Sequence, residues 1–239
     1  MIIEDWRGHL AWMFEESERT CKPLAFDCYA GLGGWDSGLD AEGFLVMGCE
    51  IDPKIAELNP YPMICANFTT LNPGDFKGFD LIVGSPPCRN YSQLIKVIGH
   101  TWKKHPPDPW GEGMRLVNAF LNFVIIAEPH YWLMENVPGL ADYLWKPPRT
   151  MSYLGKTMRR AFWGNFPAFL VPRDYNKGTM IGHRDIKAKR GKPDPSIGDI
   201  FGKGNRKGYG GLKSWERAKI PLPVARALGV AVKQALLLV

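Results

Sequence analysis

The chain has 239 residues, of which 45% are apolar and 23% charged, with a formal net charge of +6. These values are typical of a globular protein with a sizeable core, and no apolar run approaches the roughly 20 residues that a membrane span requires. The N-terminal residues carry acids and no signal-like apolar region, so we expect a cytoplasmic protein without a membrane partner. The five cysteines form no C-x-x-C pair, which argues against both a disulfide framework and a metal site.

The predicted elements alternate between helices and strands. Apolar spacing predicts helices over 4–20, 34–39, 54–59 and 115–127, and strands over 24–27, 44–49, 63–67, 81–83 and 131–134. This alternation predicts the α/β class, with a doubly wound, mostly parallel sheet and right-handed crossovers. A strongly apolar helix over 223–238 is expected to pack back on the core.

A basic segment interrupts the alternation at residues 171–219. It holds 13 Lys or Arg residues against five acids, which gives it a net charge of +8. The segment is rich in glycine and poor in apolar periodicity, so its charge indicates either a polyanion partner or a solvated insertion. We therefore expect a catalytic and cofactor-binding domain over 1–170, a small recognition region over 171–219, and a closing helix within 220–239.

A glycine-rich turn follows the first predicted strand, with glycines at positions 31, 33 and 34. Glycines let the backbone turn tightly and approach a ligand, and the next helix presents its positive end there. Glu50 closes the second strand about 20 residues further on, where nucleotide-binding folds place a carboxylate that binds ribose. The turn does not follow G-x-G-x-x-G and lacks a Lys-Ser or Lys-Thr phosphate grip. A nucleoside cofactor without pyrophosphate fits better, and S-adenosylmethionine is the leading candidate.

Cys88 follows a short apolar run, Gly84 and two prolines. Because proline cannot continue a ladder, we expect the thiol on a rigid loop at the carboxyl end of a buried strand, where open α/β sheets hold their active sites. A free cysteine is most often a small buried apolar residue, so the loop alone also fits an inert thiol. Glu135 likewise follows a buried strand, and by itself fits a salt bridge.

Taken together, these segments resemble the DNA cytosine-5 methyltransferase family, in the family's order along most of the chain. Residues 27–34 are similar to its cofactor turn, 86–88 to its Pro-Pro-Cys nucleophile loop, 135–137 to its Glu-Asn-Val element and 220–229 to its closing helix. The resemblance implies a Rossmann-like S-adenosylmethionine-dependent methyltransferase fold of the compact phage or bacterial type. It also implies that double-stranded DNA is the substrate, through base flipping and target recognition by the basic segment.

The resemblance assigns roles to individual residues. Cys88 would add to carbon 6 of a flipped cytosine, and Glu135 would act at N3 so that carbon 5 accepts a one-carbon group. Arg159 and Arg160 are the nearest equivalents of the family's Arg pair, although their spacing differs and a surface helix end is an equal alternative. The residues expected to bind the cofactor are Asp27, Tyr29, Ala30, Gly31, Leu32, Gly33, Gly34, Glu50, Ile51, Asn67, Phe68, Pro86 and Lys219.

Two departures from the family pattern concern the cofactor. Asn67 stands where the family usually has an Asp beside the adenine, and it can still accept through its amide oxygen. Arg217 and Lys219 stand where Gly-Asn-Ser or Gly-Asn-Ala is usual, near the transferable group. Cations have no role in moving an uncharged methyl group, so one hypothesis is carboxy-S-adenosylmethionine as the donor, with 5-carboxymethylcytosine as the product. A phosphate contact by the same residues is an equal alternative.

Alternatives from other classes stay open at this point. The same chemistry serves RNA, so an RNA cytosine-5 methyltransferase is one alternative. A noncatalytic DNA-binding protein built on a degenerate methyltransferase is the other alternative. In each case we expect a monomer.

Overall fold

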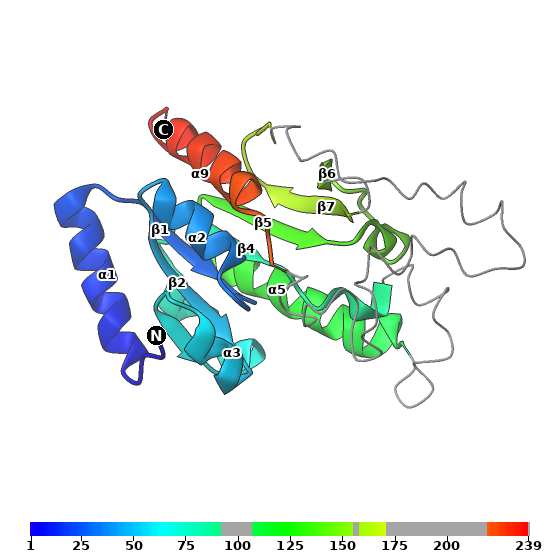
Figure 1. Cartoon of the computed structure of the whole chain (residues 1–239), viewed down its shortest axis with the longest axis horizontal. Coiled ribbons are helices and arrows are strands. Elements are labelled where there is room, and N and C mark those ends of the chain that lie inside the picture. The colour runs from blue at the N-terminus through cyan, green and yellow to red at the C-terminus, as the bar shows by residue number, and fades with distance from the viewer. Residues whose placement is uncertain (92–106, 155–157, 171–218, 239) are drawn as a thin grey trace, which may run out of the picture.

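The computed structural model describes residues 1–91, 107–154, 158–170 and 219–238. These residues form a seven-stranded sheet in the order β3-β2-β1-β4-β5-β7-β6 (Figure 1). The strands are β1 Leu24–Asp27, β2 Leu45–Glu50, β3 Met63–Cys65, β4 Leu81–Gly84, β5 Tyr131–Asn136, β6 Thr150–Leu154 and β7 Met158–Asn165. The strand order reverses between β1 and β4, which is the switch point where open α/β sheets bind ligands.

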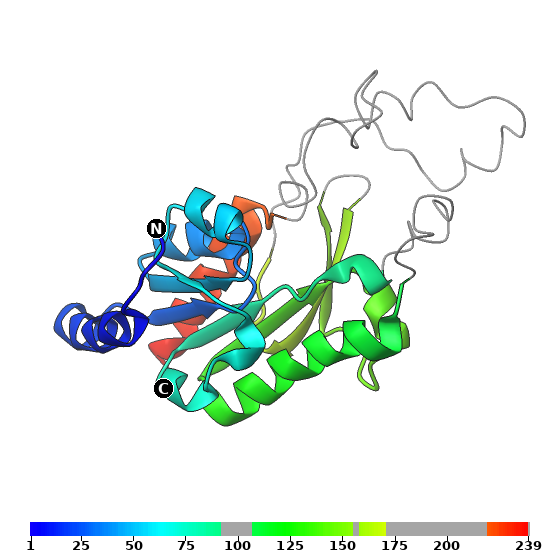
Figure 2. The ribbon, with the colours of Figure 1, turned by 90° about the horizontal axis from the view of Figure 1, so that it is seen from below.

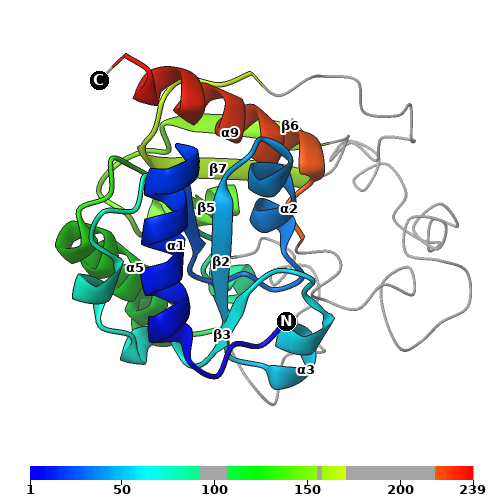
Figure 3. The same cartoon turned by 90° about the vertical axis from the view of Figure 1, so that its left-hand side faces the viewer.

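Helices cover both faces of the sheet. They are α1 Trp6–Thr20, α2 Gly34–Ala41, α3 Pro53–Leu58, α5 Met114–Ala127 and α9 Leu222–Leu236. Buried residues of α1 and α5 share one apolar cluster with β1 and β4, whereas those of α2 and α9 form a second cluster on the opposite face. Figure 3 shows α1 and α5 on one side of β2 and α2 on the other, and Figure 2 shows α5 running along the sheet. None of the helices in the described ranges is both long and apolar enough to cross a bilayer.

The closing helix α9 packs tightly on α2. A Cβ added at Gly38 would lie 2.2 Å from the Cβ of Ala225, so the two helices cross at a distance that only glycine permits. The segment before α9 comes equally close, because a Cβ at Gly34 would lie 2.4 Å from the backbone nitrogen of Ile220. The helix predicted over 223–238 is thus observed, and the residues before it lie directly against the start of α2.

The predicted α/β sheet is confirmed, and its five strands β3, β2, β1, β4 and β5 are parallel. The strands β6 and β7 are an addition that the sequence pattern did not predict. Strand β7 pairs antiparallel with β5, aligning Glu135 with Phe162, and β6 pairs antiparallel with β7. The surface helix end considered for Arg159 and Arg160 is therefore wrong, because both residues lie in β7.

Candidate active site

The loop that carries Cys88 begins where β4 ends. All four residues of β4 are buried, and Gly84 is needed because a Cβ there would lie 2.5 Å from the ring of Phe120. Pro86 and Pro87 then end the ladder, and Cys88 begins the 3-10 helix η3 Cys88–Tyr91. The thiol thus lies at the carboxyl edge of the sheet, as predicted.

Asn136 braces this loop. Its side chain is fully buried, and its Nδ2 donates a hydrogen bond of 2.9 Å to the carbonyl of Pro86. Its Oδ1 accepts from the backbone nitrogen of Val137, also at 2.9 Å. An apolar side chain could make neither contact, so the amide fixes the proline loop relative to the end of β5.

Glu135 and Arg160 form a buried ion pair beside Cys88. The Nη1 of Arg160 lies 2.8 Å from the Oε1 of Glu135, and the side chains are only 8% and 3% exposed. Burial acts to lower the pKa of Arg160, but the charge and hydrogen bond of Glu135, together with Cys88, outweigh it and raise the pKa. A buried pair of this geometry is costly to desolvate and is a weak source of stability, which suggests a role other than folding.

Electrostatic effects of this pair reach the thiol of Cys88. Burial raises the pKa of Cys88, the charge of Glu135 raises it further, and Arg160 acts in the opposite direction. The thiol is therefore protonated at neutral pH in the free protein. Arg160 favours the thiolate, which is the form of cysteine that attacks carbon.

The raised pKa predicts slow alkylation of Cys88. At pH about 7.5, iodoacetamide should modify the exposed Cys21 well before Cys88, whose rate should rise about tenfold per pH unit up to its raised pKa. Peptide mass spectrometry of timed samples measures both rates in one protein. A Cys88 rate that equals that of Cys21 and does not change with pH would contradict this electrostatic account.

The glycine turn lies at the same edge, between β1 and α2. Gly31 and Gly33 have φ angles of +52° and +70°, which favour glycine. Both oxygens of Glu50 accept from backbone nitrogens, from Gly31 at 3.1 Å and from Asp52 at 2.9 Å. The carboxylate is thereby fixed at the mouth of the turn. A Cβ built at Gly31 meets nothing within 4 Å, so open space lies over the turn.

These residues fit a nucleoside cofactor. An oriented carboxylate suits ribose hydroxyls, and the bare backbone at Gly31 allows close approach. Asp27 is buried and accepts from the backbone nitrogen of Tyr29 at 3.2 Å. Burial, followed by the charge of Asp36, raises the pKa of Asp27 well above its ordinary value. Asp27 therefore helps to shape the turn, and it is easier to protonate than an ordinary carboxyl group.

Three other residues expected to bind the cofactor, Ile51, Phe68 and Asn67, lie in different environments. Ile51 is 65% exposed directly after Glu50, whereas Phe68 is buried with its ring centroid 5.0 Å from that of Tyr29. The Oδ1 of Asn67 accepts from both the nitrogen and the hydroxyl of Thr69, at 3.1 and 2.9 Å. Both lone pairs of that oxygen are used, so its NH₂ group is the part of Asn67 left to a ligand.

A methyl group at Gly31 tests the open space. We expect Gly31→Ala to weaken S-adenosylmethionine binding about tenfold, because the methyl would occupy the space over the turn. Gly43→Ala is the matched control, since Gly43 also has a positive φ, +86°, and its Cβ would meet only Lys233, 3.6 Å away. Both variants incur a similar backbone cost of about 1 kcal/mol. Equal affinities by calorimetry would place the cofactor elsewhere.

Two contacts that join these parts have no signal in the sequence pattern. The Nε1 of Trp35, in α2, donates to Ser85 Oγ at 3.1 Å and links the cofactor turn to the Cys88 loop. Asn59 donates to the carbonyl of Gly31 at 3.1 Å. Both depend on tertiary placement, which no local pattern records. The side chain of Arg159 and the basic residues 171–218 lie outside the described residues.

The sheet order, the glycine turn and Glu50 define a Rossmann-like fold with the arrangement of a nucleotide-binding site. The family model of C-5 cytosine-specific DNA methylases matches residues 25–158, which is more than half of the chain. The chain belongs to the C-5 cytosine-specific DNA methylase family.

Two similar relatives are type II methyltransferases. Type II methyltransferase M1.HphI of Haemophilus parahaemolyticus is 25% identical over 207 residues, which cover 76% of this chain and 53% of that protein. Type II methyltransferase M.AquIA of Picosynechococcus sp. is 27% identical over 212 residues, covering 73% and 80%. This chain thus spans about half the length of M1.HphI. A solved SAM-dependent methyltransferase of Neisseria gonorrhoeae is 17% identical, with a TM-score of 0.38 and coverage of 66% and 68%.

Proposed function

We propose that this chain is a DNA cytosine-5 methyltransferase that uses S-adenosylmethionine and acts on a base flipped out of duplex DNA. The observation that carries the proposal is the cluster at the carboxyl ends of β4 and β5. Cys88 on a braced loop lies beside the buried pair of Glu135 and Arg160, on the sheet edge that also holds the glycine turn. A nucleophile, an acid and a cofactor turn on one edge support group transfer to a base.

The chemistry explains why each group is needed. Addition of the Cys88 sulfur to carbon 6 of cytosine turns the ring into an enamine, whose carbon 5 is nucleophilic. Glu135 would bond or protonate N3 and so lower the cost of that addition. Arg160 orients Glu135 and favours the thiolate of Cys88. Carbon 5 would then take the methyl group that the cofactor supplies, with S-adenosylhomocysteine as the leaving group. Loss of the proton on carbon 5 would expel the Cys88 thiolate and restore the ring.

Other residues would bind the two substrates. When bound, S-adenosylmethionine supplies an electrophilic methyl group. Glu50 would bind its ribose hydroxyls, and the bare backbone of Gly31 would allow the rest of the cofactor to approach the turn closely. Because the ring must reach Cys88, the cytosine has to leave the base stack. The basic residues of 171–219 would contact the phosphates, and a few of their side chains would read a short target sequence. The proposal extends to a cytoplasmic enzyme that acts as a monomer, since one copy of the chain carries every group named.

A second candidate concerns the group that is transferred. Lys219 directly precedes Ile220, whose backbone lies against Gly34 at the start of α2. The charge of Lys219 also reaches the buried Asp36 of that helix. A cation beside the cofactor turn favours a donor with an extra carboxylate, so carboxy-S-adenosylmethionine is the alternative donor. The carboxyl group of Asp36 attracts the same Lys219 side chain and would therefore compete with a carboxylate on the donor. For this reason methyl transfer is the first proposal.

Mass spectrometry of digested nucleosides tests these proposals together. Duplex DNA and transfer RNA are each incubated with the protein and with either S-adenosylmethionine or its carboxylated form. We expect 5-methylcytosine from DNA with S-adenosylmethionine. A carboxymethyl product formed in preference would establish the alternative donor, and modification of the RNA alone would establish the RNA enzyme. DNA binding without any product would indicate a noncatalytic protein.

A further inference from the structure

A buried asparagine under the cofactor turn ties three segments together. Asn59 follows α3 and is 1% exposed. Its Nδ2 donates to the carbonyl of Gly31 at 3.1 Å and to the Oδ2 of Asp36 at 3.3 Å. Its Oδ1 accepts from the backbone nitrogen of Tyr61 at 3.0 Å. The side chain thus joins the turn, helix α2 and the segment leading into β3.

Asp36, the carboxylate that accepts from Asn59, lies in the first turn of α2 and is also 1% exposed. The net effect of its surroundings raises its pKa to about 7: burial and the charge of Asp40 raise the pKa, whereas the hydrogen bond from Asn59 and the charge of Lys219 lower it. Two further groups interact with it electrostatically, Asp27 at the end of β1 and Tyr61 before β3. Asp36 therefore changes charge close to neutral pH. Its folded-state pKa is raised, so its contribution to stability is lost as the pH rises through about 7.

The turn needs an anchor because its glycines are intrinsically free to rotate. Gly31 and Gly33 both have positive φ, and the peptide between Gly31 and Leu32 points its carbonyl at Asn59. A Cβ at Gly33 would lie 3.0 Å from the Oδ1 of Asn59, so the amide lies against the turn at two residues. An ionised acceptor makes a hydrogen bond about twice as strong as a neutral one.

We propose that Asn59 and Asp36 are positioning residues that hold the cofactor turn in its binding geometry, and that ionisation of Asp36 strengthens this hold. The inference rests on the proposed function, because it takes the turn as the site of S-adenosylmethionine. Neither residue needs to touch the cofactor or the base. Their effect should fall on the affinity for the cofactor and leave the affinity for DNA unchanged.

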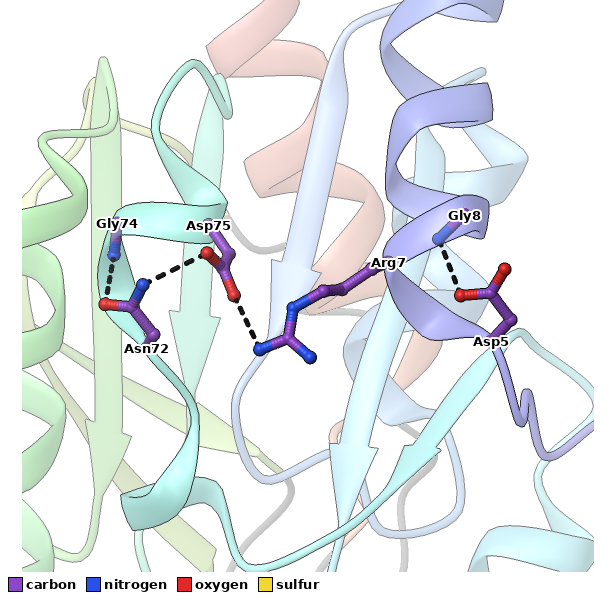
Figure 4. A network of polar contacts seen from close by, with 6 residues as sticks. All are labelled: Asp5, Arg7, Gly8, Asn72, Gly74 and Asp75. Atoms are coloured by element: carbon purple, nitrogen blue, oxygen red, sulfur yellow. Dashed lines mark hydrogen bonds and ion pairs between the residues drawn. The ribbon is translucent and has the colours of Figure 1, made fainter.

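The first test removes the amide. Asn59→Ala should raise the calorimetric Kd for S-adenosylmethionine about tenfold or more, with kcat at saturating cofactor changed less than about twofold. Asn72→Ala is the matched control. Asn72 also bonds an aspartate and a glycine nitrogen, donating to Asp75 at 3.0 Å and accepting from Gly74 at 3.2 Å, in a turn that contacts α1 through Arg7 (Figure 4). The Kd of Asn72→Ala for S-adenosylmethionine should stay within about twofold of the wild-type value.

The second test keeps the shape and removes the charge. Asp36→Asn still offers an acceptor to Asn59 but cannot ionise, so it imitates the protonated acid. Between pH 6 and pH 8.5 the wild-type affinity should improve about fivefold relative to that of Asp36→Asn. Comparing the two proteins at each pH cancels the titration of the cofactor itself.

The outcomes separate this inference from the proposed function. If the wild type binds no S-adenosylmethionine, both the proposed function and this inference are overturned. If the wild type binds and Asn59→Ala binds equally well, the positioning role alone is overturned. Should Asn59→Ala fail to fold, Asp36→Asn decides, and a pH dependence identical to that of the wild type overturns the role of Asp36 and with it the proposal.

Discussion

Replacing Cys88 with alanine should abolish cytosine modification, lowering turnover by at least about 10⁴-fold, because its sulfur is the atom proposed to form the bond to carbon 6. Cofactor affinity should stay within about twofold, since Cys88 is not part of the glycine turn. Cys21→Ala is the control, because Cys21 is an exposed thiol at the end of α1. Single-turnover assays with saturating cofactor measure the loss. Turnover that survives in Cys88→Ala would remove the catalytic assignment.

Glu135 and Arg160 should respond differently in activity and in stability. Glu135→Gln keeps the shape of the side chain but loses the acid, so turnover should fall about 10²- to 10⁴-fold. Arg160→Met should lower the free energy of unfolding by about 3 to 5 kcal/mol, because it leaves the Glu135 carboxylate buried without its partner. Urea unfolding followed by fluorescence measures this loss.

Two further variants make that experiment decisive. Lys77→Met breaks the pair of Lys77 and Glu128, whose side chains are 58% and 71% exposed, and it should cost less than about 1 kcal/mol. The double variant Glu135→Gln with Arg160→Met removes both buried charges, so it should regain stability without regaining activity. If Arg160→Met is as stable as Lys77→Met, then Arg160 does not compensate the buried charge of Glu135, and this account of the pair is wrong.

The parallel part of the fold could be predicted because its strands are short and buried on both faces. The run over 81–83 has no alternation, and its end is marked by a glycine and two prolines, so both the strand and the loop after it were recognisable. Glu50 and the glycine turn were recognisable for a similar reason, because a fixed spacing along the chain places them at one sheet edge.

The antiparallel strands and the contacts between elements could not be predicted in this way. Two consecutive arginines and Gly164 obscure the pattern of β7, and only pairing with β5 brings Arg160 next to Glu135. The partnership of Asn59 with Asp36 joins residues 23 positions apart. Neither side chain belongs to a motif, and the bond exists because two segments meet under the turn.

The most direct measurement of the central claim is a covalent complex with DNA that carries 5-fluorocytosine. Fluorine on carbon 5 cannot be removed as a proton, so the bond between Cys88 and carbon 6 should persist after transfer. Peptide mass spectrometry should then find the nucleotide on Cys88, only when S-adenosylmethionine is present, and not in Cys88→Ala. A nucleotide on another residue, or the absence of any adduct from a protein that modifies unsubstituted cytosine, would contradict the account.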